Sequence, residues 1–326
     1  MKQTFDSYPV LSFLGLTFAI TFSTWFSPLF LDLPTDISFA LMLIGGCGPL
    51  IAAYTITVIR SQTHFRISSW PVFLAIFFGS LVVLWVRLYL IDHGMSDGNG
   101  NMPRLDEISG IGYGLFLLLG LILGWNASNW NNSALKENYL TSFLFERKMI
   151  PWYLLALGLQ PAISLISYLA GTVLGMEVEG ELIQLDGMWT VGLLSTFFFF
   201  GGNEEFGWRG FMQAELQKKY SPLITVFIVS FFWSLWHLPH YYNGFYSTGG
   251  FMDMLPRFFW MIPLTVVIHW VYNKSNYSLL AVVLLHAMNN NFGKAFGSSG
   301  QIFVGIVFLL CAVLIVQDKM WRKRIR

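Results

Sequence analysis

The most prominent pattern along this chain is a succession of long apolar stretches separated by short polar segments. A transmembrane helix needs about 20 mostly apolar residues, and ten stretches approach or reach that length. They lie at 9–31, 37–59, 71–92, 110–125, 152–175, 189–210, 222–238, 255–273, 277–293 and 300–318. The pattern predicts an all-α, polytopic helical membrane protein with about eight to ten transmembrane helices.

The composition supports this interpretation. Of the 326 residues, 55% are hydrophobic, 17% are aromatic and 11% are charged, whereas soluble domains average about 25% charged residues. The formal net charge of +1 provides no basic surface, so a lipid bilayer is the expected partner and a nucleic acid is not. Cys47 and Cys311 fall inside predicted spans, and two cysteines can form neither a disulfide framework nor a four-cysteine zinc site.

The charges of the loops predict an orientation. Loops rich in Lys and Arg alternate with acidic loops along the chain, and the sequence ends in the basic tail KMWRKRIR. Because basic loops remain on the cytoplasmic side of a membrane, both termini are expected in the cytoplasm. The composition and short loops favour a bacterial cell membrane.

Polar clusters interrupt the apolar stretches in the second half of the chain. They contain Glu204, Glu205 and Arg209, then His237, and then His286 and Asn290. A charged group at bilayer depth is costly, so it marks a functional site by default. With about 1.5 Å of rise per residue, each cluster lies roughly 15 to 20 Å along its helix from a cytoplasmic turn. The sequence therefore predicts that the clusters meet in one site.

The helical period assigns different directions to the two glutamates. Residues four apart share a face, so Glu205 and Arg209 are expected to pair, while Glu204 is turned by about 100° and can point elsewhere. His286 and Asn290 also share a face, with Asn289 as a weaker rival.

Glycine and proline modify two of these helices. Gly201 and Gly202 precede the glutamates and can loosen the helix or admit a close neighbour. Pro239 is expected to end the helix that carries His237.

This set of side chains suits the hydrolysis of an amide bond. A carboxylate beside a histidine can hold a water molecule and remove its proton. A second histidine and an asparagine amide can donate hydrogen bonds to the oxyanion that develops on the attacked carbonyl. Neither a Ser-His-Asp nor a Cys-His nucleophile is evident.

The clusters resemble the motifs of a known family. EEFGWR at 204–209 matches the EExxxR motif of the CAAX prenyl protease type II family, also called the CAAX protease and bacteriocin-processing family, which includes glutamate intramembrane proteases. WSLWH at 233–237 is similar to the second motif, FxxxH, and HAMNN at 286–290 fits the third, HxxxN. Trp233 stands where phenylalanine is usual, and we expect this change mainly to alter the wall beside the site.

The resemblance implies a role for each matching position. These roles are general base for Glu204, water positioning for His237, a supporting pair for Glu205 and Arg209, and oxyanion donors for His286 and Asn290. The implied enzyme is a metal-independent intramembrane endopeptidase without a cofactor. Its implied substrate is a hydrophobic or lipid-modified peptide or membrane protein.

Together these observations predict the organisation of the chain. No linker divides it, so 1–326 is expected to form a single integral membrane domain. Scaffold spans are expected in 1–188, the catalytic core in 189–293, and the last span and basic cytoplasmic tail in 294–326.

Two other functions stay open. A zinc-dependent membrane peptidase could use His237, His286 and Glu204, with His240 as a further ligand, although the HExxH motif is missing and Pro239 lies between His237 and His240. Alternatively, a non-proteolytic peptide-binding or bacteriocin-immunity membrane protein would keep the scaffold without cleaving a substrate.

Overall fold

The computed structural model describes residues 2–95, 102–129, 135, 143 and 145–323. This part of the chain is almost entirely helical, and it contains no strand beyond an isolated antiparallel bridge between Glu179 and Ser298. The predicted all-α fold is confirmed.

By length and composition, five of the described helices could cross a membrane. They are α6 (Trp70–Asp92), α7 (Gly110–Ser128), α9 (Ile150–Leu174, preceded by η2 at Arg147–Met149), α14 (Phe251–Lys274) and α16 (Gly300–Gln317). A sixth span would consist of α4 (Thr35–Gly46) and α5 (Gly48–Arg60), which are bent by 44°. The chain is therefore a polytopic helical membrane protein, as predicted, but five or six such helices among the described residues are fewer than the eight to ten that the sequence predicts.

The remaining helices are shorter. They are α1 (Lys2–Ser7), α2 (Pro9–Trp25), α3 (Ser27–Phe30), η1 (Leu105–Glu107), α10 (Gly187–Phe198), α13 (Pro222–Trp236), η5 (Leu238–Tyr241) and α15 (Leu279–Ala295). Of these, α2 and α13 are apolar but too short to count as spans.

The predicted span at 189–210 is interrupted. After α10 the chain continues through η3 (Gly202–Glu204), α11 (Glu205–Gly207), the π-helical η4 (Trp208–Gln213) and α12 (Ala214–Gln217). π-helical turns are often found at functional sites, and this one follows α11, which begins at Glu205.

Local signals fix where the helices of the predicted site begin and end. The side chain of Asp186 accepts a hydrogen bond from the backbone at the start of α10. Ser221 and Ser278 do the same for α13 and α15, as N-cap residues commonly do. Pro239 follows the end of α13 as predicted, and His237 becomes the C-cap of that helix.

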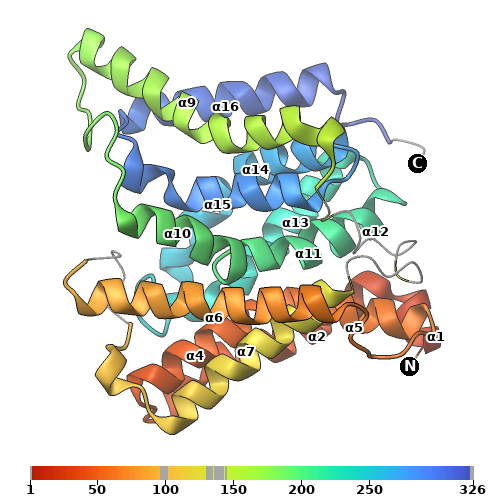
Figure 1. The fold of residues 1–326 in the computed structure, drawn as a ribbon. Coiled ribbons are helices and arrows are strands. Elements are labelled where there is room, and N and C mark those ends of the chain that lie inside the picture. The colour runs from red at the N-terminus through yellow and green to blue at the C-terminus, as the bar shows by residue number, and fades with distance from the viewer. Residues whose placement is uncertain (1, 96–101, 130–134, 136–142, 144, 324–326) are drawn as a thin grey trace.

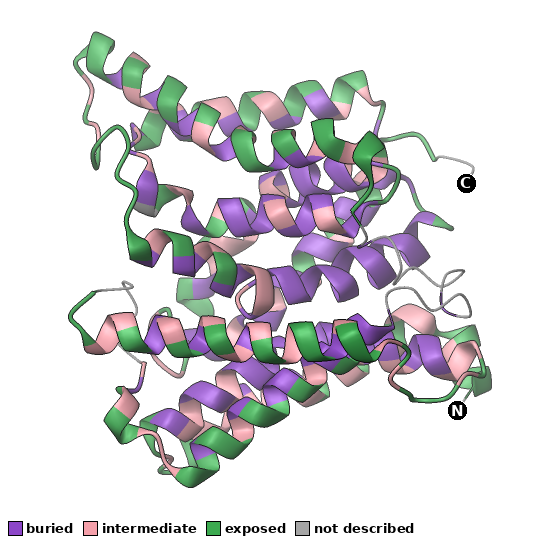
Figure 2. Ribbon diagram, in the orientation of Figure 1, coloured by how far each residue is buried: buried purple, intermediate pink, exposed green. Residues whose placement is uncertain are grey.

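The two halves of the chain form two groups of helices (Figure 1). Helices α1 to α7 lie in the lower half of the view and α9 to α16 in the upper half, with α10 packed along α6 between them. Outward faces of α6, α7, α9 and α16 are exposed and apolar, whereas the facing surfaces are buried (Figure 2). Large exposed apolar faces fit contact with lipid.

Candidate active site

A sharp backbone turn before η3 positions the two glutamates. Gly201 has φ +141°, and a Cβ atom built on it would lie 2.5 Å from Nε2 of His286. Both the conformation and the close approach of α15 therefore favour glycine. Asn203 braces the turn because its Nδ2 donates a hydrogen bond of 3.0 Å to the carbonyl of Gly46. The sequence expectation of a loosened helix and a close neighbour is confirmed.

Glu204 is buried, and Trp233 orients its carboxylate. Nε1 of Trp233 donates a hydrogen bond of 2.8 Å to Oε2 of Glu204. Phenylalanine has no such donor, so the expectation that Trp233 mainly alters the wall of the site is wrong. The ring of Trp233 also lies 4.1 Å from the guanidinium carbon of Arg209. Trp233 therefore contacts both Glu204 and Arg209.

Glu205 is fully buried and accepts two hydrogen bonds at the same oxygen. Its Oε1 lies 3.0 Å from Nη1 of Arg209 and 2.6 Å from Nδ1 of His286. The predicted pair with Arg209 is confirmed, whereas the sequence did not predict the contact with His286. Because an ionised carboxylate only accepts, Nδ1 of His286 carries a hydrogen. Nε2 of the same ring lies close to Gly201, on the side of the ring that faces the cavity.

His237 presents a ring nitrogen that can accept a hydrogen bond. Its Nδ1 lies 2.7 Å from the backbone carbonyl of Trp233. A carbonyl oxygen cannot donate, so Nδ1 carries the hydrogen and Nε2 keeps a lone pair. Water is a suitable donor to that lone pair.

His286 and Asn290 both line the same cavity from α15, as their spacing predicts. Nδ2 of Asn290 donates a hydrogen bond of 2.8 Å to the carbonyl of Phe200. An amide nitrogen carries two hydrogens, so one remains for another acceptor. Asn289 also lines the cavity, but its Oδ1 accepts a hydrogen bond of 3.0 Å from Gln160.

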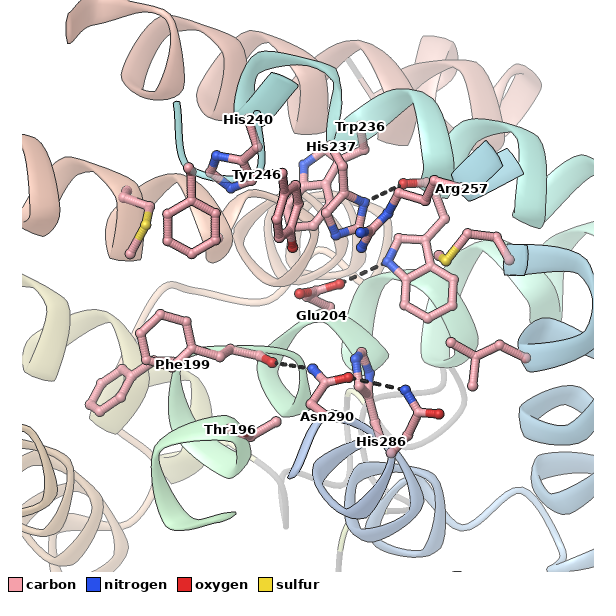
Figure 3. A pocket seen from close by; sticks show the side chains of 18 of the residues that line it. Thr196, Phe199, Glu204, Trp236, His237, His240, Tyr246, Arg257, His286 and Asn290 are labelled. Atoms are coloured by element: carbon pink, nitrogen blue, oxygen red, sulfur yellow. Dashed lines mark hydrogen bonds between the residues drawn. The ribbon is translucent and has the colours of Figure 1, made fainter. Parts of the chain in front are cut away.

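These side chains surround a cavity of about 370 Å³. Figure 3 shows Glu204 between His237 on one side and His286 and Asn290 on the other. They reach the cavity from η3, the end of α13 and α15. The structure thus brings the predicted polar set together, while the pair formed by Glu205 and Arg209 lies fully buried outside the lining.

The N-terminal half also contributes to this cavity. Trp25 of α2, Gly46 of α4 and Arg87 of α6 are part of its wall. The ring of Trp25 stacks on that of His240 at 3.9 Å between centroids. The first helices therefore enclose the site as well as support it.

Two functional candidates in the cavity were missed by the sequence reasoning. Arg257 of α14 and Tyr246 of the preceding loop both line it, with the Arg257 guanidinium carbon 4.8 Å from the centre of the Tyr246 ring. An arginine inside the predicted span 255–273 is the signal that could have identified the first. Tyr246 carries no comparable signal in the sequence.

The arrangement of ligands gives the zinc hypothesis no support. Across the residues that the structure describes, no group of three or more His, Cys, Asp or Glu side chains is placed to hold a metal ion. His237 and His240 lie 6.5 Å apart between ring centroids.

Comparisons with known proteins match the second half of the chain to an enzyme family. Residues 186–292 match the family described as type II CAAX prenyl endopeptidase Rce1-like. The chain is also similar to a "CAAX prenyl protease 2" from Methanococcus maripaludis, with 28% identity over 233 residues, which cover 65% of this chain and 84% of that protein. The resemblance predicted from the motifs is confirmed, and the matched segment contains every predicted site residue.

Proposed function

We propose, on the premise that residues 186–292 place this chain in the type II CAAX prenyl endopeptidase family, a metal-free mechanism of peptide cleavage. In this mechanism Glu204 activates a water molecule that attacks the peptide bond. Membership makes the chain an intramembrane endopeptidase that acts on a peptide substrate in a lipid bilayer. The metal-free mechanism is supported by the cavity and its hydrogen bonds.

Activation of water would occur between Glu204 and His237. The indole of Trp233 occupies Oε2 of Glu204, which leaves Oε1 as the oxygen best placed to take a proton. Nε2 of His237 can accept the second hydrogen of the same water, because Nδ1 is committed to a backbone carbonyl. Two acceptors orient the water and increase its nucleophilicity.

Stabilisation of the oxyanion would come from α15. When His286 is protonated on both nitrogens, Glu205 accepts from Nδ1 and Nε2 can donate to the oxyanion. The second amide hydrogen of Asn290 is the other donor. Donors that the fold already directs at a developing charge are effective because they need no reorganisation.

The reaction balances with these groups alone. Water forms the new bond to the carbonyl carbon, and Glu204 takes the proton released. When the carbon–nitrogen bond breaks, Glu204 returns that proton to the departing amine. One carboxylate therefore serves as base and then as acid.

The observation that carries this proposal is the convergence of Glu204, His237, His286 and Asn290 on one cavity. Aromatic side chains form much of its remaining wall, including those of Phe199, Phe200 and Trp260. Such a wall suits a hydrophobic or lipid-modified peptide.

We further propose a bacterial cell membrane as the location, with both termini in the cytoplasm. The alternation of basic and acidic loops and the basic C-terminal tail support this orientation. Within the chain, 189–293 would act as the catalytic core.

The decisive experiment compares purified wild-type protein with Glu204→Gln on hydrophobic peptides that carry a fluorophore and a quencher. We expect kcat to fall by about 10³-fold, because general base catalysis contributes about 10²- to 10⁴-fold. Glu177→Gln makes the same chemical change on the exposed loop after α9 and should leave the rate unchanged. Full activity of Glu204→Gln would remove the proposal.

A further inference from the structure

The two proposed oxyanion donors are held in different ways. His286 is buried, and the carboxylate of Glu205 holds its ring. Asn290 lines the same cavity but is exposed, so packing does not fix its side chain. The terminal torsion of an asparagine amide is broad and roughly two-fold. Hydrogen bonds therefore decide which end of the Asn290 amide faces a substrate.

Three side-chain amides form a continuous hydrogen-bonded chain, which we call the amide relay. Nε2 of Gln160 donates to Oδ1 of Asn289 at 3.0 Å. Nδ2 of Asn289 donates to Oδ1 of Asn290 at 3.1 Å, and Nδ2 of Asn290 donates to the carbonyl of Phe200 at 2.8 Å. Figure 3 shows a hydrogen bond on either side of the Asn290 amide. The relay thus connects α9, through α15, with the backbone just before Gly201.

The carbonyl of Phe200 fixes the direction of every bond in the relay. A carbonyl oxygen cannot donate, so the end of Asn290 that faces Phe200 is the amide nitrogen. The oxygen of Asn290 then faces Asn289 and accepts from its nitrogen. By the same reasoning, the oxygen of Asn289 accepts from the nitrogen of Gln160. Reversing any one amide would place two donors or two acceptors against each other at a neighbouring bond.

Gln160 begins the relay from a buried position. It is 7% exposed on α9, which packs against α15. Its Oε1 is buried and has no hydrogen-bond partner among the described residues. A buried acceptor without a donor is destabilising, and an apolar side chain of similar size would avoid this cost. The contribution of Gln160 therefore lies in the hydrogen that its nitrogen donates to Asn289.

We propose that Gln160 and Asn289 are positioning residues for cleavage, which orient the Asn290 amide so that its second hydrogen is presented to the oxyanion. This inference rests on the proposed function, since it assumes that Asn290 stabilises the oxyanion. A donor that is oriented in advance needs no reorganisation when the charge develops. The relay extends the catalytic machinery to α9, within the segment 1–188 that the sequence predicts to contain scaffold spans.

A purely structural role for the same bonds predicts a different result. If the bonds only hold α9 against α15, losing them and losing the Asn290 amide are independent changes, and their effects on kcat multiply. If the relay acts through Asn290, its loss has no further effect once the Asn290 amide is absent. A double-mutant cycle separates the two roles.

The test measures steady-state cleavage of a quenched hydrophobic peptide by the full-length protein. Gln160→Met keeps the size of the side chain and removes the donor. It should lower kcat by about 3- to 10-fold, the value of one hydrogen bond between neutral groups, and leave KM unchanged. Asn290→Ala should lower kcat by about 10²-fold, and the variant with both changes should be no slower than Asn290→Ala alone.

A second variant removes the middle of the relay. Asn289→Ala should lower kcat by the same factor as Gln160→Met, because the two bonds act in series. Combining Asn289→Ala with Gln160→Met should add no further loss.

Gln213→Met is the matched control. Gln213 is also a buried glutamine whose Nε2 donates to an asparagine, Asn273, at 3.2 Å. Its Oε1 likewise has no hydrogen-bond partner in the part of the chain that the structure describes. Neither Gln213 nor Asn273 lines the cavity, so the same chemical change should leave kcat unchanged.

Two results would overturn the inference, namely full kcat in Gln160→Met or losses that multiply when Gln160→Met and Asn290→Ala are combined. If Asn290→Ala is slow, either result leaves the proposed mechanism intact. Full activity of Asn290→Ala would instead remove the oxyanion donor, and the role of the relay with it. If Glu204→Gln were active while the combined variant showed no added loss, the assignment of the base would fail and the relay would stand.

Discussion

Replacing Glu205 with glutamine should destabilise the fold, whereas the same change at the neighbouring Glu204 should not. Oε1 of Glu205 accepts from both Arg209 and His286. Glutamine keeps the shape and one acceptor oxygen but removes the negative charge. Arg209 stays protonated in proteins and is fully buried, so Glu205→Gln leaves an uncompensated charge in the core.

The size of the effect follows from that burial. Removing one partner of a buried ion pair costs about 3 to 5 kcal/mol, a large share of the roughly 5 to 15 kcal/mol by which proteins are stable. The contact of Arg209 with the ring of Trp233, at 4.1 Å, remains in the variant. A cation–π contact is worth up to about 2 kcal/mol when desolvated, so it cannot replace the lost pair.

Glu204 provides the matched comparison. It forms no ion pair among the described residues, and glutamine can still accept the hydrogen bond from Trp233. Removing an unpaired buried charge should leave the free energy of unfolding unchanged or raise it. Glu204→Gln should therefore be inactive but stable, and Glu205→Gln unstable.

The assay is unfolding of each purified variant in mixed micelles with increasing dodecyl sulfate, followed by tryptophan fluorescence. Wild type, Glu204→Gln and Glu205→Gln are measured side by side, and their free energies of unfolding are compared. The reasoning is refuted if Glu205→Gln lies within about 1 kcal/mol of the wild type, well below the expected cost of an unpaired charge. An equal loss in both variants would refute it as well.

Three further results are expected. Trp233→Phe removes the donor to Glu204 and should lower kcat by about 10-fold, the value of one hydrogen bond to a charged group, with KM little changed in steady-state kinetics. Gly201→Ala should lower kcat by about 10²-fold by displacing His286 from the oxyanion, while Gly79→Ala, which has open space around it, should keep its rate. Cleavage should persist after dialysis against a chelator, and metal analysis of that active sample should detect no stoichiometric zinc.

The sequence located most helices because their apolar stretches end at strong local signals. The predicted stretch 222–238 corresponds to α13, where Pro222 begins the helix and Pro239 follows its end. The stretch 189–210 did not form one helix, because the turn at Gly201 depends on the close approach of His286 from α15. Apolar periodicity contains no information about such a contact between distant segments.

In the site, too, contacts between residues close in sequence were predictable and contacts between distant segments were not. The pair formed by Glu205 and Arg209 is four residues apart, so helical spacing alone predicted it. The contact between Glu205 and His286 joins residues 81 positions apart and required the fold. The sequence shows at Trp233 only the replacement of one aromatic residue by another. Its hydrogen bond to Glu204 depends on the fold, which brings α13 and η3 together.

A charge at membrane depth does not by itself identify a reactive group. The sequence marks Glu204, Glu205 and Arg209 equally as costly residues in an apolar stretch. Helical spacing separates them, because Glu205 and Arg209, four residues apart, form an ion pair outside the cavity lining, while Glu204 lines the cavity.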